Sequence, residues 1–238
     1  MPNKGFLSVV VIVISVIMSA TMVFAADNID PALAKDTFAI GMNPERNYLV
    51  LVNDDNAYSF DGDYDQALQP DLVYIADYQG EATPIEKGAN TAFSMLKQYL
   101  FERGIFIEIL SAYRTKEDQQ FVCEEYGNLE GWSDTNKVPK PGYSEHHTGL
   151  LLDVVIWWPM LGEWATETSE RQENDPSFFE PIHSVLPDYG FIDRYPPGKE
   201  EITGYPSEPY EIRFVGSSKI AHDIMDNGLC LEEYLATK

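Results

Sequence analysis

The sequence predicts a globular domain that mixes helices and β-strands, and three observations lead to this class. Short apolar runs rich in β-branched residues predict strands at 48–52, 105–110 and 150–157. The chain has 44% hydrophobic and 13% aromatic residues, which is enough apolar material for a core. Between the first two strands, apolar side chains recur on one helical face: Ala89, Ala92, Phe93, Leu96 and Leu100. Periodicity alone does not separate an α/β from an α+β arrangement.

The expected elements follow one another along the chain. The first strand leads into a turn at 53–56, and residues 72–75 are extended. Pro84 near the start and Gly104 after the end bound the first helix. The strand at 105–110 runs into a helix that ends at residue 126, with Thr115 as its N-cap. After 150–157 we expect a short helix, a turn with a strand, and two helices, at 176–186, 189–195, 217–225 and 231–235.

The N-terminus has the pattern of a targeting segment over residues 1–25. Lys4 precedes an apolar run at 6–18, and Val23-Phe-Ala25 offers small residues for a signal peptidase. The apolar run is also nearly long enough to span a bilayer, so an uncleaved membrane anchor is the alternative. Both alternatives place the rest of the chain outside the cytoplasm, with a lead-in at 26–46 and one domain over 47–238.

Charge and cysteine content narrow the function classes. The formal net charge is -23, with 39 acidic against 16 basic residues, which argues against nucleic acid as a partner. The two cysteines, Cys123 and Cys230, form no metal-type cluster. They fit either one disulfide of an exported protein or two buried thiols.

The stretch 141–156 carries the first candidate site. Pro141, Gly142 and Gly149 indicate a loop, and the apolar run after it reads as a buried strand interrupted by Asp153. A carboxylate inside a buried strand is costly unless it is paired or binds a metal. His146, in the loop entering that strand, has a side chain suited to zinc. The alternative is a core histidine and a strand aspartate that never bind a metal.

Arg114 is the second candidate. It lies where the predicted strand at 105–110 passes into the next helix, so it is placed to meet an anionic ligand or an oxyanion at a sheet edge. Many arginines in such positions are simply solvated or paired with a surface acid.

Three segments, in this order, resemble the zinc D-Ala-D-Ala peptidases. They are Ser111-Ala-Tyr-Arg114 with Gln119; Ser144-x-His146-x-x-Gly149-x-x-x-Asp153; and the segment 189–216, which contains Glu208-Pro-Tyr-Glu211. The chain is most similar to the VanY-type D-alanyl-D-alanine carboxypeptidases, within a fold group that includes lysostaphin-type endopeptidases and the hedgehog domain. The resemblance covers roughly residues 47–236.

The resemblance implies a fold and an activity. The fold would be α+β, with a small, mainly antiparallel sheet that bears a metal site on one face and helices on the other. The activity would be a metallo-carboxypeptidase that removes the terminal D-Ala from peptidoglycan stem peptides ending in D-Ala-D-Ala. We expect a monomer that faces the cell wall, either secreted or anchored to the membrane by its N-terminus.

The resemblance also implies roles for metal-site residues. His146 and Asp153 would bind the metal, and Glu208 would be the general base that takes a proton from water. The third ligand of the family is a histidine, and this chain has Glu211 in its place. Glutamate binds zinc at a similar distance, so zinc is the expected single divalent metal. A carboxylate-rich set also favours manganese or another harder metal, which is the alternative.

Three further residues match substrate-side positions. Arg114 would stabilise the developing oxyanion, and Ser144 and Gln119 would contact the substrate. The other histidines are poor substitutes for the missing ligand. His147 is expected to point elsewhere, and His183 and His222 fall in predicted helices.

The change at Glu211 leaves two hypotheses. In the first, the protein is an active peptidase with His146, Asp153 and Glu211 as ligands. In the second, it is a catalytically inactive family member that acts as a peptidoglycan-binding or regulatory protein.

Overall fold

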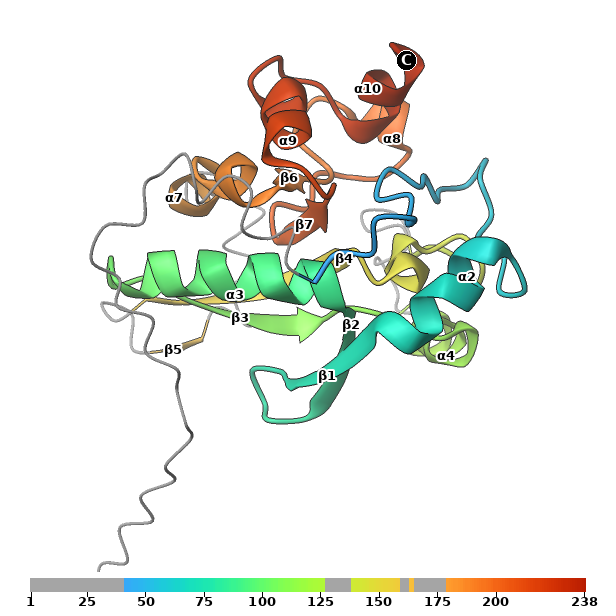
Figure 1. Cartoon of the computed structure of the whole chain (residues 1–238), viewed down its shortest axis with the longest axis horizontal. Helices are drawn as coiled ribbons and strands as arrows, with labels where there is room; N and C mark the ends of the chain where they lie inside the picture. Colours follow the sequence, from blue (N-terminus) through green and yellow to red (C-terminus); the bar gives the residue numbers. More distant parts are fainter. Residues whose placement is uncertain (1–40, 127–137, 159–162, 165–178) are drawn as a thin grey trace, which may run out of the picture. The chain divides into compact units, whose positions relative to one another are not determined.

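The centre of the fold is a five-stranded sheet in which every neighbouring pair is antiparallel. The computed structural model describes residues 41–126, 138–158, 163–164 and 179–238, which all belong to the unit Pro31–Lys238. The strand order is β3 (Phe106–Ser111), β4 (Leu151–Trp158), β7 (Glu211–Phe214) and β6 (Phe191–Asp193), with β5 (Glu163–Trp164) paired to β4. A second sheet pairs β1 (Leu72–Ala76) with β2 (Ala82–Glu86) (Figure 1).

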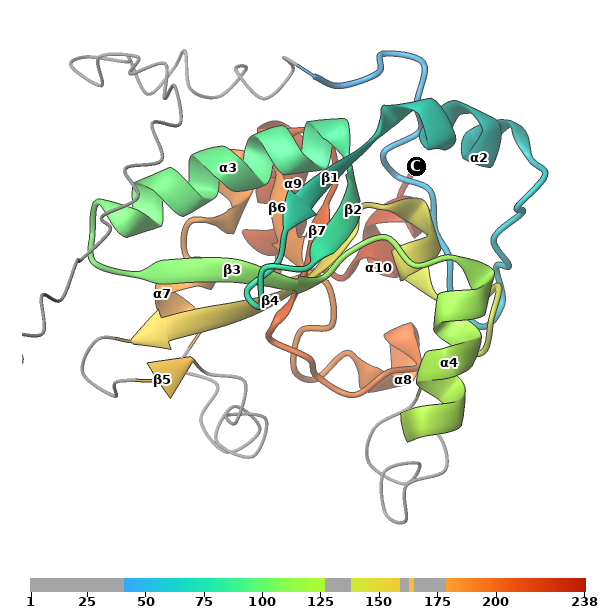
Figure 2. The ribbon, with the colours of Figure 1, turned by 90° about the horizontal axis from the view of Figure 1, so that it is seen from below.

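Alternation along the strands gives the five-stranded sheet two different faces. Leu152 and Val154 of β4 and Ile212 and Phe214 of β7 belong to the main apolar core. Helix α3 (Lys87–Phe101) runs along β3 and adds its own buried face to the same core (Figure 2). Asp153 lies between two core residues and therefore faces the other side. The α+β class and the mainly antiparallel sheet are therefore confirmed.

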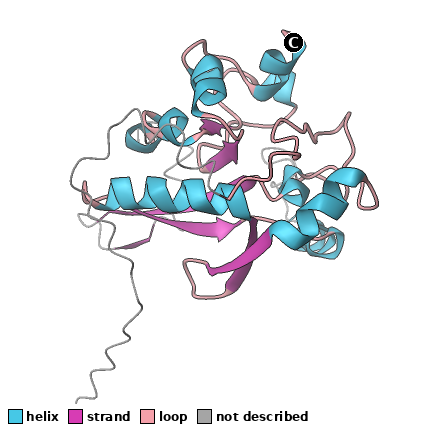
Figure 3. Ribbon diagram, in the orientation of Figure 1, coloured by secondary structure: helices cyan, strands magenta, loops and turns pink. Residues whose placement is uncertain are grey.

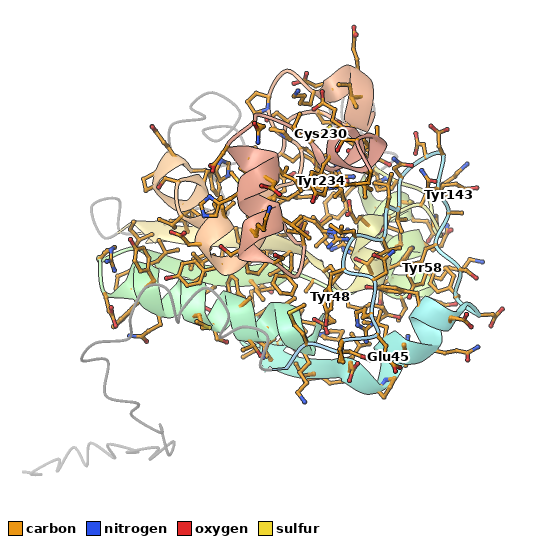
Figure 4. The ribbon with its side chains drawn as sticks, turned by 45° about the horizontal axis from the view of Figure 1, so that its top comes forward. Glu45, Tyr48, Tyr58, Tyr143, Cys230 and Tyr234 are labelled. Atoms are coloured by element: carbon orange, nitrogen blue, oxygen red, sulfur yellow. The ribbon has the colours of Figure 1, made fainter. Side chains whose placement is uncertain are left out.

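The remaining helices are short, and Figure 3 shows them around the strands. Helices α9 (Ser218–Met225) and α10 (Leu231–Ala236) pack on β6 through a second apolar cluster that includes Ile192, Ile224 and Leu231. The buried Cys230 and Tyr234 lie in this C-terminal part (Figure 4). The helices are α2 (Asp63–Leu68), α4 (Lys116–Tyr126), α7 (Glu180–His183), α8 (Glu200–Thr203), α9 (Ser218–Met225) and α10 (Leu231–Ala236), with 3₁₀ turns at Gln69–Asp71, Glu145–Thr148 and Leu186–Tyr189.

Most predicted elements are confirmed within a residue or two, including β1, β3, β4, β6, α4, α9 and α10. Thr115 caps α4 as predicted, because its Oγ1 accepts a hydrogen bond from the Asp118 N–H at 3.1 Å. The helix predicted within 176–186 is partly confirmed as α7, and residues 176–178 lie outside the described part.

Two predictions about the N-terminal half are wrong. Residues 48–52 form no strand, because the carbonyls of Tyr48 and Val50 accept hydrogen bonds from the Arg213 guanidinium instead of from a neighbouring strand. Pro84 does not start a helix. It lies inside β2, and α3 begins after Glu86, whose side chain accepts a hydrogen bond from the Ala89 N–H at 2.8 Å.

Both cysteines are free thiols. Cys123 on α4 lies 3.2 Å from the Pro139 carbonyl, and Cys230 precedes α10. Among the residues that the structure describes, no helix is both long and apolar enough to cross a membrane. The predicted targeting segment at 1–25 and most of the lead-in at 26–46 lie outside the described residues and stay predictions.

Candidate metal centre

His146 is held with one ring nitrogen turned toward the sheet. It lies in the 3₁₀ turn Glu145–Thr148, which leads into β4 through Gly149 at a φ of 70°. Its Nδ1 is 2.6 Å from the Ala112 carbonyl oxygen. A carbonyl only accepts, so Nδ1 carries a proton, and Nε2 is the nitrogen that presents a lone pair in the neutral ring. This arrangement is typical of a metal-binding histidine, whose second nitrogen is fixed by a backbone carbonyl.

Asp153 and Glu211 meet this lone pair from neighbouring strands. They are directly paired across β4 and β7, so their side chains leave the same face of the sheet. His146 Nε2 lies 3.2 Å from Asp153 Oδ1 and 3.9 Å from Glu211 Oε1. One ligand atom from each of the three residues lies within 4.8 Å of the others.

Two of these atoms are left without hydrogen bonds. Within the described part of the chain, His146 Nε2 and Asp153 Oδ1 are buried and have no hydrogen-bond partner outside the cluster; they face each other at 3.2 Å. A buried polar atom without a partner costs free energy, and native proteins rarely tolerate it. A cation between the three side chains would satisfy both atoms. The residues present therefore fit a divalent metal.

The charges of the cluster favour a cation as well. Burial and the neighbouring Arg114 lower the pKa of His146, but the Asp153 and Glu211 carboxylates raise it to about 9. Burial raises the pKa of Asp153, but His146 and Arg114 lower it to about 2. Burial and the Asp153 charge raise the pKa of Glu211. The carboxylates thus raise the pKa of His146, and Asp153 raises that of Glu211; a divalent metal would neutralise this negative charge.

Arg114 is brought to the cluster by an irregularity in β3. A β-bulge shifts the register between Ile109 and Ser111, so Ser111 pairs with Asp153. The Arg114 Nη2 then donates to Asp153 Oδ2 at 2.6 Å, and its Nε donates to Ser111 Oγ at 2.9 Å. Asp153 thus presents one oxygen to the metal centre and the other to a fixed cation.

The predicted substrate-side residues differ in what they offer. Gln119 is fully buried, and both ends of its amide are engaged, by Arg114 Nη1 at 3.4 Å and by the Pro139 carbonyl at 2.7 Å. It therefore supports Arg114 directly. Ser144 is also buried, and its Oγ has no hydrogen-bond partner among the described residues.

Glu208 begins a turn that leads into β7. The Glu211 N–H donates to the Glu208 carbonyl at 2.9 Å, which closes a four-residue turn around Pro209 and Tyr210. Burial raises the pKa of Glu208 well above its ordinary value, and the charges of Glu211 and Asp153 raise it further. The predicted base is therefore in the electrostatic field of the predicted ligands.

The other three histidines do not join the cluster. His147 Nδ1 donates to the Arg114 carbonyl at 2.7 Å, and its Nε2 accepts from the Gly142 N–H at 3.0 Å. Both of its nitrogens are occupied, as expected for a histidine that points elsewhere. His183 contacts the Pro209 carbonyl, and His222 contacts Asp188 and Asp226.

Sequence reasoning missed a buried charge network behind the ligands, here called the Glu145 network and made of Glu145, Arg194, Arg213 and Glu232. The Glu145 carboxylate accepts from Arg194 Nε on one oxygen and from Arg213 Nε on the other, at 2.6 Å for Arg213. Arg194 also pairs with Glu232 at 2.8 Å. The network joins the turn of His146 to β7 and α10. The available signal was Arg213, a charge between the apolar Ile212 and Phe214.

Comparison with known proteins agrees with this geometry. The family model for VanY, D-alanyl-D-alanine carboxypeptidase, matches residues 83–217. The chain belongs to the VanY family. The protein YodJ of Bacillus subtilis is 32% identical over 206 residues, which cover 81% of this chain and 68% of YodJ.

Solved structures of VanY proteins share the fold. A VanY variant from a VanB-type resistance cassette, in complex with Zn(II), matches with a TM-score of 0.60 and 28% identity over 79% of this chain and 98% of the other. VanYB in complex with D-alanine-D-alanine matches with a TM-score of 0.59 and 29% identity, over 80% of this chain and 98% of VanYB. The L,D-carboxypeptidase LdcB matches with a TM-score of 0.63 and 30% identity, over 80% of this chain and 86% of the LdcB chain. This VanY member is therefore similar both to D,D- and to L,D-carboxypeptidases.

Replacing Glu211 with histidine tests whether it is a ligand. We expect Glu211→His to bind Zn²⁺ more tightly than the parent and to discriminate more strongly against Mn²⁺, because imidazole suits zinc and carboxylates suit harder cations. The dissociation constants of both metals can be measured by competition with a chromophoric chelator. Unchanged constants for both metals would mean that Glu211 does not touch the metal.

Proposed function

We propose that the protein is an extracytoplasmic metallo-carboxypeptidase that removes the terminal D-Ala from peptidoglycan stem peptides. The observation that supports this most strongly is the pair of buried, unpartnered atoms, His146 Nε2 and Asp153 Oδ1, which converge with Glu211 in a chain of the VanY family. The VanY structure in complex with Zn(II) makes zinc the expected metal for this chain. Manganese or another harder metal is the alternative, because of Glu211.

His146, Asp153 and Glu211 would hold the metal. When bound, it would polarise the scissile carbonyl and acidify a water. Glu208 then takes the proton of the attacking water as the oxygen bonds to the carbonyl carbon. The same carboxyl returns a proton to the nitrogen of the leaving D-Ala as the C–N bond breaks. Burial and the charges of Glu211 and Asp153 raise the pKa of Glu208, and a metal between those two carboxylates would lower it again and leave Glu208 able to take a proton.

Arg114 and Ser144 act on the substrate side. The Arg114 guanidinium is fixed by Asp153, Ser111 and Gln119, so its charge needs no rearrangement when the carbonyl oxygen becomes negative. The Ser144 hydroxyl offers one hydrogen bond to a polar group of the peptide. The VanYB complex with D-alanine-D-alanine supports a peptide ending in D-Ala-D-Ala as the substrate.

The proposed location and oligomeric state of the protein rest on other features. The apolar run at 6–18 supports export, either as a cleaved signal or as an anchor that leaves the domain facing the cell wall. A stem peptide is a single-chain ligand that one site can bind, so we propose that the protein works as a monomer.

The presence of Glu211 supports a second candidate function. The protein would then be an inactive family member that acts as a peptidoglycan-binding or regulatory protein. The two carboxylate ligands cancel the charge of a divalent metal, and the water near it would be less acidic than beside two histidines. Such a protein would bind the stem peptide without cleaving it.

Release of D-alanine by the purified, metal-stripped protein distinguishes these candidates. Single divalent metals are added back, with a stem pentapeptide ending in D-Ala-D-Ala and a tetrapeptide ending in one D-Ala as parallel substrates. Release from the pentapeptide that returns with one metal supports the proposal and names the metal. Release from the tetrapeptide alone would make the protein an L,D-carboxypeptidase, as LdcB is. If no metal restores D-alanine release and the protein still binds the pentapeptide, the result would favour the inactive candidate.

A further inference from the structure

The turn Glu208–Glu211 is contacted by His183 from the core side of the sheet. His183 ends α7, and its Nδ1 lies 3.6 Å from Asp193 Oδ2. Asp193 is paired with Ile212 across β6 and β7, so its side chain leaves the face that carries the apolar core. Glu211 precedes Ile212 and faces the other side. His183 therefore reaches the turn from behind the metal centre.

The contact is a hydrogen bond to the central peptide of the turn. The His183 Nε2 lies 2.8 Å from the Pro209 carbonyl oxygen, and a carbonyl only accepts, so Nε2 carries a proton. The ring of Phe179 stacks on the imidazole with centroids 5.9 Å apart, and the Asp193 carboxylate lies at Nδ1. Phe179 thus packs on one face of the donor ring, and the Asp193 carboxylate lies near its second nitrogen.

The central peptide decides which of two turn types forms. Proline at the second position fits both type I and type II turns, which differ mainly in the direction of the carbonyl that follows it. In this turn that carbonyl belongs to Pro209. The Tyr210 carbonyl accepts from the Val154 N–H at 3.0 Å, which ties the last part of the turn to β4. His183 supplies the corresponding restraint on the first part.

We propose that His183 is a positioning residue that selects one orientation of the Pro209 peptide and thereby fixes Glu208 relative to Glu211. This inference rests on the proposed function, because it gives Glu208 the role of base and Glu211 the role of ligand. His183 touches neither the metal nor the substrate. It acts through the backbone that carries both carboxylates. A metal centre with one imidazole and two carboxylates depends on such a restraint, because each carboxylate has several binding geometries.

His183→Phe and His183→Gln test the proposal in the full chain. Phenylalanine keeps the ring that stacks on Phe179 and removes the donor, whereas the glutamine amide nitrogen takes nearly the place of Nε2 and restores it. We expect His183→Phe to weaken Zn²⁺ binding by about 10- to 100-fold. We also expect a lower kcat for D-alanine release, with KM little changed. His183→Gln should recover most of both losses. His222→Phe, which removes a partly exposed histidine of α9, is the matched control and should change neither.

The metal dissociation constant keeps this test separate from the proposed function. If the parent protein releases no D-alanine with any metal, the Zn²⁺ constants of the parent, His183→Phe and His183→Gln still decide the role of His183. Parent-like Zn²⁺ binding and kinetics in a folded His183→Phe protein would overturn the proposal. Equal impairment of the phenylalanine and glutamine variants would overturn it too. If His183→Phe does not fold, His183→Asn replaces it, because its amide lies at the Nδ1 position and leaves the Pro209 carbonyl unpaired.

Discussion

Replacing Glu208 with glutamine is expected to lower kcat for D-alanine release by about 100- to 10,000-fold, the usual contribution of a general acid–base group. Glutamine has the same size and can still accept a hydrogen bond, but it cannot take a proton from water. The metal should remain bound with nearly the parent affinity, because its proposed ligands are His146, Asp153 and Glu211. Loss of turnover with retained metal would therefore separate the base from the ligands.

The measurement combines two assays on the same purified variant. D-alanine release is followed at saturating stem peptide, and Zn²⁺ binding is followed by chelator competition. Glu201→Gln is the matched control, since Glu201 is an exposed glutamate of α8, away from the cluster. A Glu208→Gln protein as active as the parent would remove Glu208 from the mechanism. A large loss of Zn²⁺ affinity would instead make Glu208 a ligand.

Replacing Glu145 with alanine is expected to lower the free energy of unfolding by about 3–5 kcal/mol, the usual cost of breaking a buried charge pair. Arg194 and Arg213 have side chains that are 0% exposed, and they share the Glu145 carboxylate. Without it, two buried cations face each other behind His146. Arg194 retains Glu232, and Arg213 retains the carbonyls of residues 48 and 50, so the charge is only partly compensated.

Urea unfolding of the metal-stripped protein measures this effect without a contribution from metal binding. The midpoint should fall with an unchanged slope if only stability changes. Asp223→Ala is the control, because it breaks the exposed pair with Lys219 on α9, where no measurable change is expected. If Glu145→Ala unfolds at the parent midpoint, the Glu145 network is not what holds the turn of His146 against β7.

The metal centre was foreseeable because its residues have strong local signals. Asp153 interrupts an apolar strand, His146 precedes that strand in a glycine-bounded loop, and Arg114 lies where another strand passes into a helix. The distances between them were not foreseeable. They depend on the pairing of Asp153 with Glu211 across β4 and β7 and on the bulge that brings Arg114 to Asp153. Pairing and bulges between distant segments leave little trace in a local pattern.

The same limit explains the errors of the sequence analysis. Residues 48–52 have the composition of a strand, but the partner of their carbonyls is the side chain of Arg213, more than 150 residues later in the chain. Pro84 has the preference of a helix start, but pairing with Tyr74 holds it in β2. The sequence showed that His183 lies in a helical segment. It could not show that the imidazole reaches the Pro209 carbonyl.

By itself, the sequence determined a domain of mixed helices and strands, most of its elements, the family resemblance that implies the α+β fold, and the identity of the residues at the candidate metal centre. These depend on local propensity, periodicity and motif spacing, which adjacent residues carry. Only the tertiary structure decided which atoms are free for a metal, which cations are buried behind it and which histidine restrains the turn of Glu208. Those features depend on contacts between residues far apart in the chain, which form only when the sheet and its helices pack together.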